Sequence, residues 1–369
     1  MITEAEGGKV LKQLLPGYLR RNALSSFDSI LQLGPDVKKP DIFVRYIDND
    51  SHEYFCAHSV EEDGTISSSP KYYIYPPSHL TKNCFFTGAC RNGLLHFQNM
   101  QWDHLLWNPT TNEFKTLPEF DKHPRVTNHH FGSGIWCDNR CADNYKLLQL
   151  VMADKVDEEG RCIDLRYYYH LYSLKTNSWK KIPTTQFGNI GMCGACINDC
   201  FYCGATQNDD TDVILSFDFS TETLSSLPLP PGSGGLCSYY FLEYKGLFGF
   251  FICWEAERIP FKFELWVRKN ESWTRESVFH ARGVYRPLWF ARNGELLYFA
   301  SLIDEILAFD RTTGKLKHLG IHPFTGSIFP FFESFVQFNG VSDVEEQEEE
   351  EEEEEEEKND MLLKQKRDH

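Results

Sequence analysis

The chain has 369 residues, of which 41% are hydrophobic and 25% charged, a balance typical of a globular protein with a sizeable core. Its 37 Lys and Arg stand against 54 Asp and Glu without a basic cluster that would neutralise phosphates, so we expect no nucleic-acid partner. Neither an apolar run of about 18 residues nor a secretory signal is visible, so we expect no membrane association. This favours a cytoplasmic protein, or a nuclear one, whose 12 Cys stay reduced.

Helical periodicity is almost confined to the start of the chain. Leucines recur at Leu11, Leu14 and Leu15, and a second apolar series follows over residues 23–31. Pro16 and Gly17 interrupt the pattern and Pro35 ends it. We therefore predict a short helical N-terminal segment over residues 1–39.

Five stretches of the middle region repeat one pattern. An apolar run ends at an aromatic residue, a polar turn follows, and an aromatic residue or Leu stands seven positions after the first: Trp107/Phe114, Tyr172/Trp179, Phe217/Leu224, Trp266/Trp273 and Phe309/Leu316. A β-hairpin explains these anchor pairs, because turns rich in Asn, Asp, Thr, Ser or Gly reverse the chain between two strands. The constant spacing predicts the same turn length in every copy.

The distances between successive anchors indicate the architecture. They are 65, 45, 49 and 43 residues, and the last three match the roughly 40–50 residues of a four-stranded propeller blade. The first distance either contains a long loop or hides a degenerate copy. Further strand-like runs lie at residues 41–47, 54–59, 72–75 and 93–97, ahead of the first copy. We predict an all-β, propeller-like domain of about six blades over residues 40–340, of the kelch or galactose-oxidase kind. An irregular β-sandwich that reuses Asn and Thr turns is the alternative.

The end of the chain differs in composition. Residues 345–357 hold 12 Glu and Gln347, and a short basic stretch follows at residues 364–367. Such a Glu run repels itself and cannot bury apolar surface. We predict a disordered acidic tail over residues 341–369.

Several segments of the middle region match, in the right order, the motifs of one known family. They are residues 90–95, 106–111, 114–118, 172–179, 264–267, 271–274, 287–297 and 332–336. Residues 287–297, with the sequence PLWFARNGELL, match best. On these motifs, residues 40–338 resemble the plant F-box-associated domain, and within that family they are most similar to S-locus F-box and S-locus-F-box-like proteins.

The resemblance implies a function. In that family an N-terminal F-box binds the Skp adaptor of a cullin-based ubiquitin ligase, and the associated domain selects the protein substrate; the pollen members recognise S-RNases. Here Leu15 and Pro16, with Ile30 and Leu31, form only a wrongly spaced remnant of the F-box, and the family's Cys-Lys-x-Trp helix is absent. The resemblance therefore implies a non-catalytic substrate receptor, with adaptor binding through these four residues. The alternative is an F-box-less binding protein that does not recruit the ligase.

Residues that would support an enzyme are few. Cys193, Cys196, Cys200 and Cys203 have a spacing that fits neither a zinc ribbon nor a ferredoxin run. The resemblance places residues 196–204 in a hairpin, so we expect Cys196, Cys200 and Cys203 to pack as small core residues. Neither a nucleophile elbow nor a metalloprotease motif occurs. We therefore predict no catalytic centre, no metal and no cofactor. A small-molecule or metal-dependent propeller enzyme is a further alternative, which metal analysis of the purified protein would test.

We predict that the acidic residues of three loops bind the partner, because negative charge on exposed loops steers a basic partner. They are Glu61, Glu62 and Asp63, then Asp157, Glu158 and Glu159, and finally Asp209, Asp210 and Asp212. A purely solubilising role for these loops is the alternative. Basic targets of the S-RNase type carry positive charge, which is opposite to that of these loops.

Overall fold

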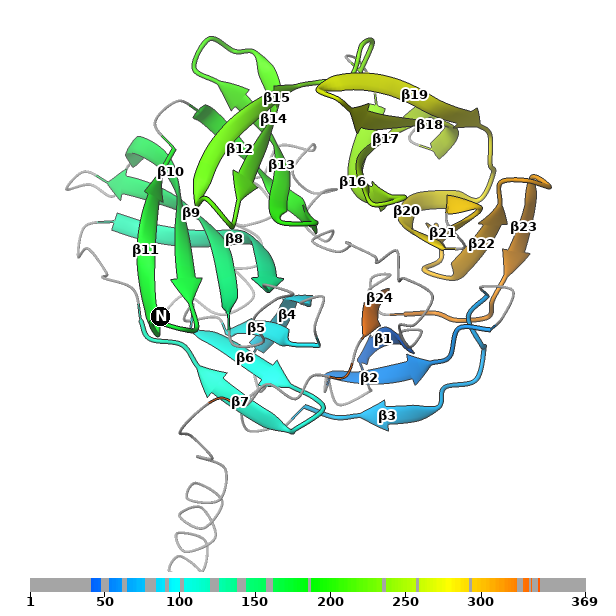
Figure 1. Ribbon diagram of the computed structural model, residues 1–369, viewed down its shortest axis with the longest axis horizontal. Helices are drawn as coiled ribbons and strands as arrows, with labels where there is room; N and C mark the ends of the chain where they lie inside the picture. The colour runs from blue at the N-terminus through cyan, green and yellow to red at the C-terminus, as the bar shows by residue number, and fades with distance from the viewer. Residues whose placement is uncertain are drawn as a thin grey trace, which may run out of the picture.

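The computed structural model contains six four-stranded antiparallel sheets arranged around one axis (Figure 1). It describes residues 41–338 except 48–52, 62–64, 77–83, 90–92, 100–102, 120–125, 138–143, 157–161, 185–186, 234–236, 257–258, 292–293, 324–327, 332 and 334–337. All 24 regular elements of this part are strands. The all-β propeller of about six blades is thereby confirmed, and the sandwich alternative is wrong. The predicted N-terminal helical segment and acidic tail lie outside the described residues.

Each blade is one sheet whose four strands lie side by side and follow one another in order from the axis to the rim. Blade 1 contains β24 (Ile328–Phe331), β1 (Asp41–Ile47), β2 (Glu53–His58) and β3 (Tyr72–Ile74). Blade 2 contains β4 (Cys84–Ala89), β5 (Leu95–Asn99), β6 (His104–Asn108) and β7 (Glu113–Thr116). Blade 3 contains β8 (Val126–Cys137), β9 (Tyr145–Val156), β10 (Cys162–Ser173) and β11 (Ser178–Pro183).

Blades 4 to 6 repeat this order. Blade 4 contains β12 (Phe187–Ile197), β13 (Cys200–Gln207), β14 (Asp212–Asp218) and β15 (Thr223–Pro228). Blade 5 contains β16 (Cys237–Tyr244), β17 (Leu247–Ala256), β18 (Ile259–Lys269) and β19 (Ser272–Phe279). Blade 6 contains β20 (Val284–Ala291), β21 (Leu296–Ser301), β22 (Ile306–Asp310) and β23 (Lys315–His318).

The ring is closed by pairing the last strand with the first. β24 runs antiparallel to β1, with Phe43 opposite Phe329. The rings of Phe43 and Phe331 stack with their centroids 3.8 Å apart, and both side chains are buried. Because β24 comes from the end of the propeller and β1 to β3 from its beginning, blade 1 holds the two ends of the ring together.

Four of the five anchor pairs are direct cross-strand partners in the outer hairpin of a blade. These pairs are Trp107/Phe114, Tyr172/Trp179, Phe217/Leu224 and Phe309/Leu316. In each, the residue just before the second strand has a positive φ, as at Asn112 (55°) and Gly314 (68°). A left-handed residue at this position is what a short hairpin loop needs to reverse the chain, which favours Asn and Gly there.

The remaining anchor pair corrects the prediction of a constant turn length. Lys269 pairs with Ser272, so the turn holds only Asn270 and Glu271, both with positive φ as a type I′ turn requires. Trp273 therefore lies opposite Arg268 rather than Trp266.

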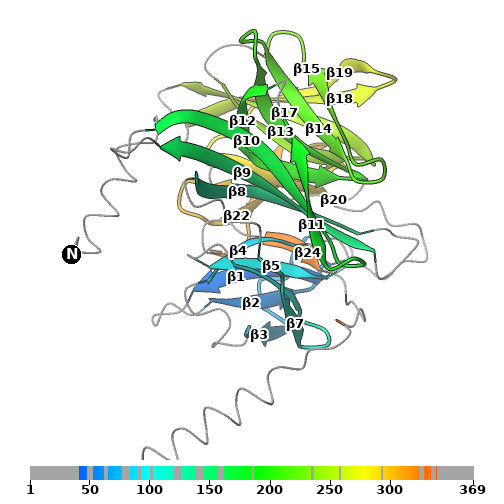
Figure 2. The ribbon, with the colours of Figure 1, turned by 90° about the vertical axis from the view of Figure 1, so that its left-hand side faces the viewer.

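Blade 3 explains the longest anchor distance. Its strands β8, β9 and β10 each have 12 residues, and Figure 2 shows this blade at the edge of the disc. The first two anchors belong to the neighbouring blades 2 and 3, so the distance of 65 residues hides no additional copy.

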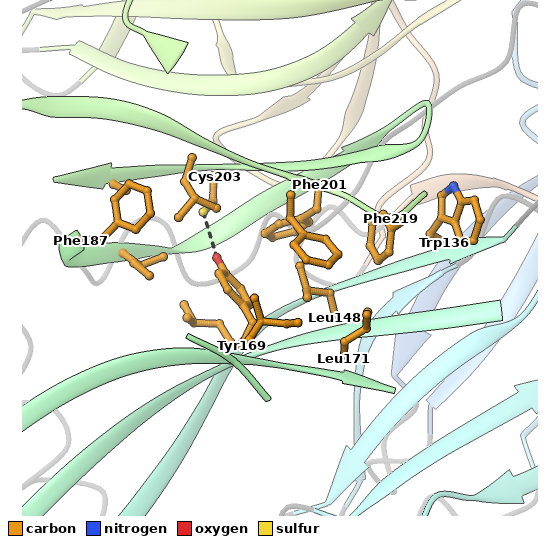
Figure 3. Close-up of a cluster of buried hydrophobic side chains, with 14 of the residues drawn as sticks. Trp136, Leu148, Tyr169, Leu171, Phe187, Phe201, Cys203 and Phe219 are labelled. Carbon is orange, nitrogen blue, oxygen red and sulfur yellow. Dashed lines mark hydrogen bonds between the residues drawn. The ribbon is translucent and has the colours of Figure 1, made fainter. Parts of the chain in front are cut away.

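Aromatic and aliphatic side chains fill the spaces between blades. Between blades 3 and 4, Tyr169, Phe201 and Phe219 pack in one buried cluster (Figure 3). Burial of each such side chain stabilises the fold by about 1.5–3 kcal/mol. At Gly194 of β12, a Cβ atom would lie 2.5 Å from the carbonyl oxygen of Tyr202 and still closer to Phe201, so this contact between strands requires glycine.

Hydrogen bonds from rim tryptophans join neighbouring blades. Trp179 of blade 3 donates its indole N–H to the carbonyl of Pro118, which follows blade 2, at 2.7 Å. Trp273 of blade 5 donates to the carbonyl of Pro228 in blade 4 at 2.8 Å. The second anchor of these two hairpins therefore fixes the preceding blade as well as its own.

Candidate functional site

The two faces of the disc carry different connections. The anchor face carries the turns between the first and second strands of blades 2 to 6 and the connections between the third and fourth strands of every blade. Asn198 in the β12–β13 turn donates to the carbonyl of Gly246 in the β16–β17 turn at 3.0 Å, so these turns meet on that face. The link face carries the turns between the second and third strands and the connections from blade to blade. Because loops of a rigid scaffold carry function, both faces are candidate binding surfaces.

The predicted acidic residues of blade 4 lie on the link face. Asp209, Asp210 and Asp212 are exposed in and beside the β13–β14 turn. Asp209 accepts a hydrogen bond from the backbone N–H of Thr211 at 3.1 Å, and bonds to Thr211 lower the pKa of this carboxyl. Asp212 accepts from the Thr206 hydroxyl at 3.1 Å. These carboxylates stabilise their own turn and present negative charge to solvent.

The other predicted binding residues are not gathered with this turn. Glu61 is exposed in the β2–β3 connection, which starts at the anchor face, the opposite face of the disc. The structure therefore does not bring Glu61 and the blade 4 turn together. Glu62, Asp63, Asp157, Glu158 and Glu159 lie outside the described residues, as do the predicted adaptor-binding residues Leu15, Pro16, Ile30 and Leu31.

Two exposed apolar groups were not among the residues predicted to bind. Leu302 and Ile303, 55% and 71% exposed, form the tip of the β21–β22 turn on the link face. The turn is fixed because the hydroxyl of Ser301 accepts hydrogen bonds from the N–H groups of Ile303 and Glu305. The signal in the sequence that could have identified this group is an apolar dipeptide between two short strands.

The second exposed group consists of tyrosines on blade 1. Tyr73 and Tyr75 are 56% and 62% exposed, and both rings lie against Tyr54 at centroid distances of 6.3 and 5.5 Å. Tyr54 in turn stacks on Tyr46 at 5.4 Å. We call Tyr46, Tyr54, Tyr73 and Tyr75 the tyrosine ladder. Its exposed rings are held from behind by half-buried ones, so the surface is already ordered for contact.

The cysteine cluster has the predicted hairpin position, in β12 and β13. Cys203 is fully buried, and its sulfur lies 3.2 Å from the hydroxyl of Tyr169, as the dashed line in Figure 3 shows. Burial raises the pKa of the thiols of Cys196 and Cys200. Metal ligation and nucleophilic attack both need the thiolate, so this environment favours packing over chemistry. The described residues contain no group of three potential metal ligands.

The most strongly perturbed histidine lies in the interior of blade 2. His96 is fully buried, with its Nε2 2.9 Å from Nδ1 of His104, and Gln98 lies 3.4 Å beyond. Burial lowers the pKa of His96 to about 3. The chain of polar groups is enclosed on its far side by Trp179 of blade 3, which contacts His104 at a centroid distance of 5.2 Å. These histidines therefore connect strands rather than face a ligand.

Six four-stranded blades around one axis define a β-propeller. Residues 42–317 match the family model described as the F-box associated beta propeller domain. The chain belongs to this family. In the part that the structure describes, no helix is long and apolar enough to cross a membrane.

Three relatives from Arabidopsis thaliana carry related names. The chain is 27% identical over 148 residues to a protein named F-box/kelch-repeat protein At3g17570, covering 39% of this chain and 36% of that protein. It is 27% identical over 156 residues to one named F-box only protein 15, covering 42% of this chain and 34% of that protein. It is 29% identical over 122 residues to one named F-box protein At3g22650, covering 32% of this chain and 31% of that protein. The matches span about a third of each relative's length. None of the three is named as an S-locus F-box protein, so that narrower resemblance stays a prediction.

Proposed function

We propose that this chain is the substrate-recognition subunit of an SCF-type ubiquitin ligase. The observation that carries the proposal is the match of residues 42–317 to the F-box associated propeller family, together with the names of its relatives. In this role the propeller binds the target protein, while residues 1–39 bind the Skp adaptor, which connects to the cullin. The chain contributes no catalytic group, because ubiquitin transfer belongs to the other subunits. We place this activity in the cytoplasm, with the nucleus as the second compartment.

The test is reconstitution with purified Skp adaptor and cullin. The full-length chain should co-elute with the adaptor on size exclusion, and joint replacement of Leu15, Ile30 and Leu31 by Asp should abolish co-elution. A variant with Leu302→Ser and Ile303→Ser, on the exposed turn of blade 6, is the matched control. Failure of the unaltered chain to bind the adaptor would refute ligase recruitment.

A second candidate is a binding protein that does not recruit the ligase. It is favoured by the wrongly spaced F-box remnant and by the missing Cys-Lys-x-Trp helix in residues 1–39. Target binding without adaptor binding in the same preparation would support it.

The targets we propose are basic proteins, including those of the S-RNase type. The support is charge: the chain has a formal net charge of -17, and the exposed Asp209, Asp210 and Asp212 add negative charge to the link face. Binding of a basic S-RNase should weaken at least threefold when all three residues are changed to Asn. Equal binding by the variant would exclude this turn.

A further inference from the structure

The outermost strand of blade 1 differs from the outermost strands of the other five blades. An exposed sheet edge tends to pair with other chains, and proteins usually prevent this with charged residues or proline. The other five outermost strands carry such residues, namely Lys115, Lys180, Pro228, Arg275 and Lys315. β3 reads Tyr72-Tyr73-Ile74, with neither a charge nor a proline. Among the described outermost strands, β3 is the one without such a residue inside its bounds, although Lys71 precedes it and Pro76 follows Tyr75.

The side chains of β3 alternate between contact with the core and exposure to solvent. Ile74 packs against the buried cluster between blades 1 and 2. Tyr73, and Tyr75 just after the strand, belong to the exposed end of the tyrosine ladder and lie two residues apart. Side chains two residues apart share one face of an extended chain, so the two rings would meet alternate residues of a paired segment.

The charge around this edge favours a cationic partner. Tyr72 donates to Asp41 at 3.4 Å, and Asp41 also pairs with Lys71 at 2.6 Å. Burial, Asp41 and Glu333 together raise the pKa of Tyr72 to about 12, which places two carboxylates beside the strand. Tyrosine faces attract guanidinium and ammonium groups. Lys71 offsets one of the two carboxylates, so the faces of the tyrosine rings are the main groups that favour Arg or Lys.

We propose that the edge of β3 is a docking strand for an extended basic segment of the target protein, which pairs with it by backbone hydrogen bonds and places Arg or Lys on Tyr73 and Tyr75. This inference rests on the proposed function in so far as the occupant is a target for ubiquitination. It differs from the acidic turn of blade 4, which lies on another blade and supplies charge without an open sheet edge.

The test uses the full chain and a fluorescent acetyl-(Thr-Arg)4-amide peptide. The probe should bind, and hydrogen exchange should show new protection of the amides of residues 72–75. The double variant Tyr73→Ser, Tyr75→Ser should weaken binding at least fivefold, whereas Ser225→Lys, on the exposed edge strand of blade 4, should leave it within twofold. A (Thr-Glu)4 peptide should not bind. A (Pro-Arg)4 peptide, which lacks backbone donors, should bind at least fivefold more weakly.

Three results would overturn the docking strand. They are equal probe binding by the unaltered chain and the double tyrosine variant, protection that appears in residues 208–212 or 302–305 instead of 72–75, and a dimer of the free chain that the double variant dissolves. Both tyrosines are largely exposed, so unchanged thermal unfolding of the variant confirms that its fold is intact. Adaptor co-elution, measured on the same variant, keeps the two proposals apart. If the double tyrosine variant loses peptide binding but still co-elutes with the adaptor, the result concerns the docking strand alone. If the chain binds the peptide but does not co-elute with the adaptor, ligase recruitment is refuted.

Discussion

Protonation of His96 should destabilise the propeller in acidic solution. Its pKa falls from 6.5 to about 3 in the folded state because the imidazole is fully buried. The unfolded chain therefore binds the proton first. The contribution of His96 to stability is fully present above about pH 6.5 and is lost as the pH falls towards 3. One proton corresponds to about 1.4 kcal/mol per pH unit, so the difference between the two pKa values sets an upper limit of about 4–5 kcal/mol.

Urea unfolding at several pH values between 7 and 4 measures this effect. We expect His96→Gln, which keeps a donor and an acceptor but cannot titrate, to cost about 1–3 kcal/mol at pH 7. Below pH 6 the free energy of unfolding should fall by about 1.4 kcal/mol per pH unit less in this variant than in the unaltered chain. His280→Gln, at an exposed position after β19, tests whether the exchange itself alters the slope. Equal slopes for the unaltered chain and His96→Gln would refute the reasoning.

Three further changes test the packing and the closure of the ring. Phe43→Ala should lower the free energy of unfolding by about 3–5 kcal/mol in urea titrations, because Phe43 is fully buried and its ring contacts Phe55, Phe329 and Phe331. A loss under about 1 kcal/mol would contradict a closing role for β24. Trp273→Phe should cost about 1 kcal/mol in the same assay, since it removes the hydrogen bond to the preceding blade, and no change would show that this bond contributes nothing. Gly194→Ala should cost about 1–3 kcal/mol through overpacking against β13, which a lower midpoint of thermal unfolding would show. An unchanged midpoint would mean that β12 and β13 can move apart to hold the added methyl group without loss of stability.

The blade count was predictable because hairpin chemistry is local. The outer hairpins at Trp107 and Phe309 contain their own anchors and turn residues, so a short stretch of sequence determines each one. The pair at Trp266 was misread, because a two-residue turn at Asn270 and Glu271 shifts the register without changing the sequence spacing. Spacing along the chain cannot distinguish these two arrangements, whereas the positive φ at both turn residues does.

Closure and the docking strand depend on distant parts of the chain. Blade 1 lacks the anchor pattern, and its innermost strand comes from Ile328–Phe331, almost the whole length of the propeller away. The apolar run at Tyr72–Ile74 indicated a strand, but not that this strand lies at a rim with Tyr73 exposed. Charge alone singled out the acidic loops, and only the fold shows that Glu61 and Asp209 belong to connections on opposite faces.

The position of β24 also has a consequence for synthesis of the protein. While the ribosome is still making blades 2 to 6, β1 has only β2 as a neighbour, and its inner side waits for residues 328–331. Blade 1 is thus the first blade to be translated and the last to be completed. A nascent chain of this kind leaves the side of Phe43 that packs on Phe331 uncovered until residues 328–331 have been made.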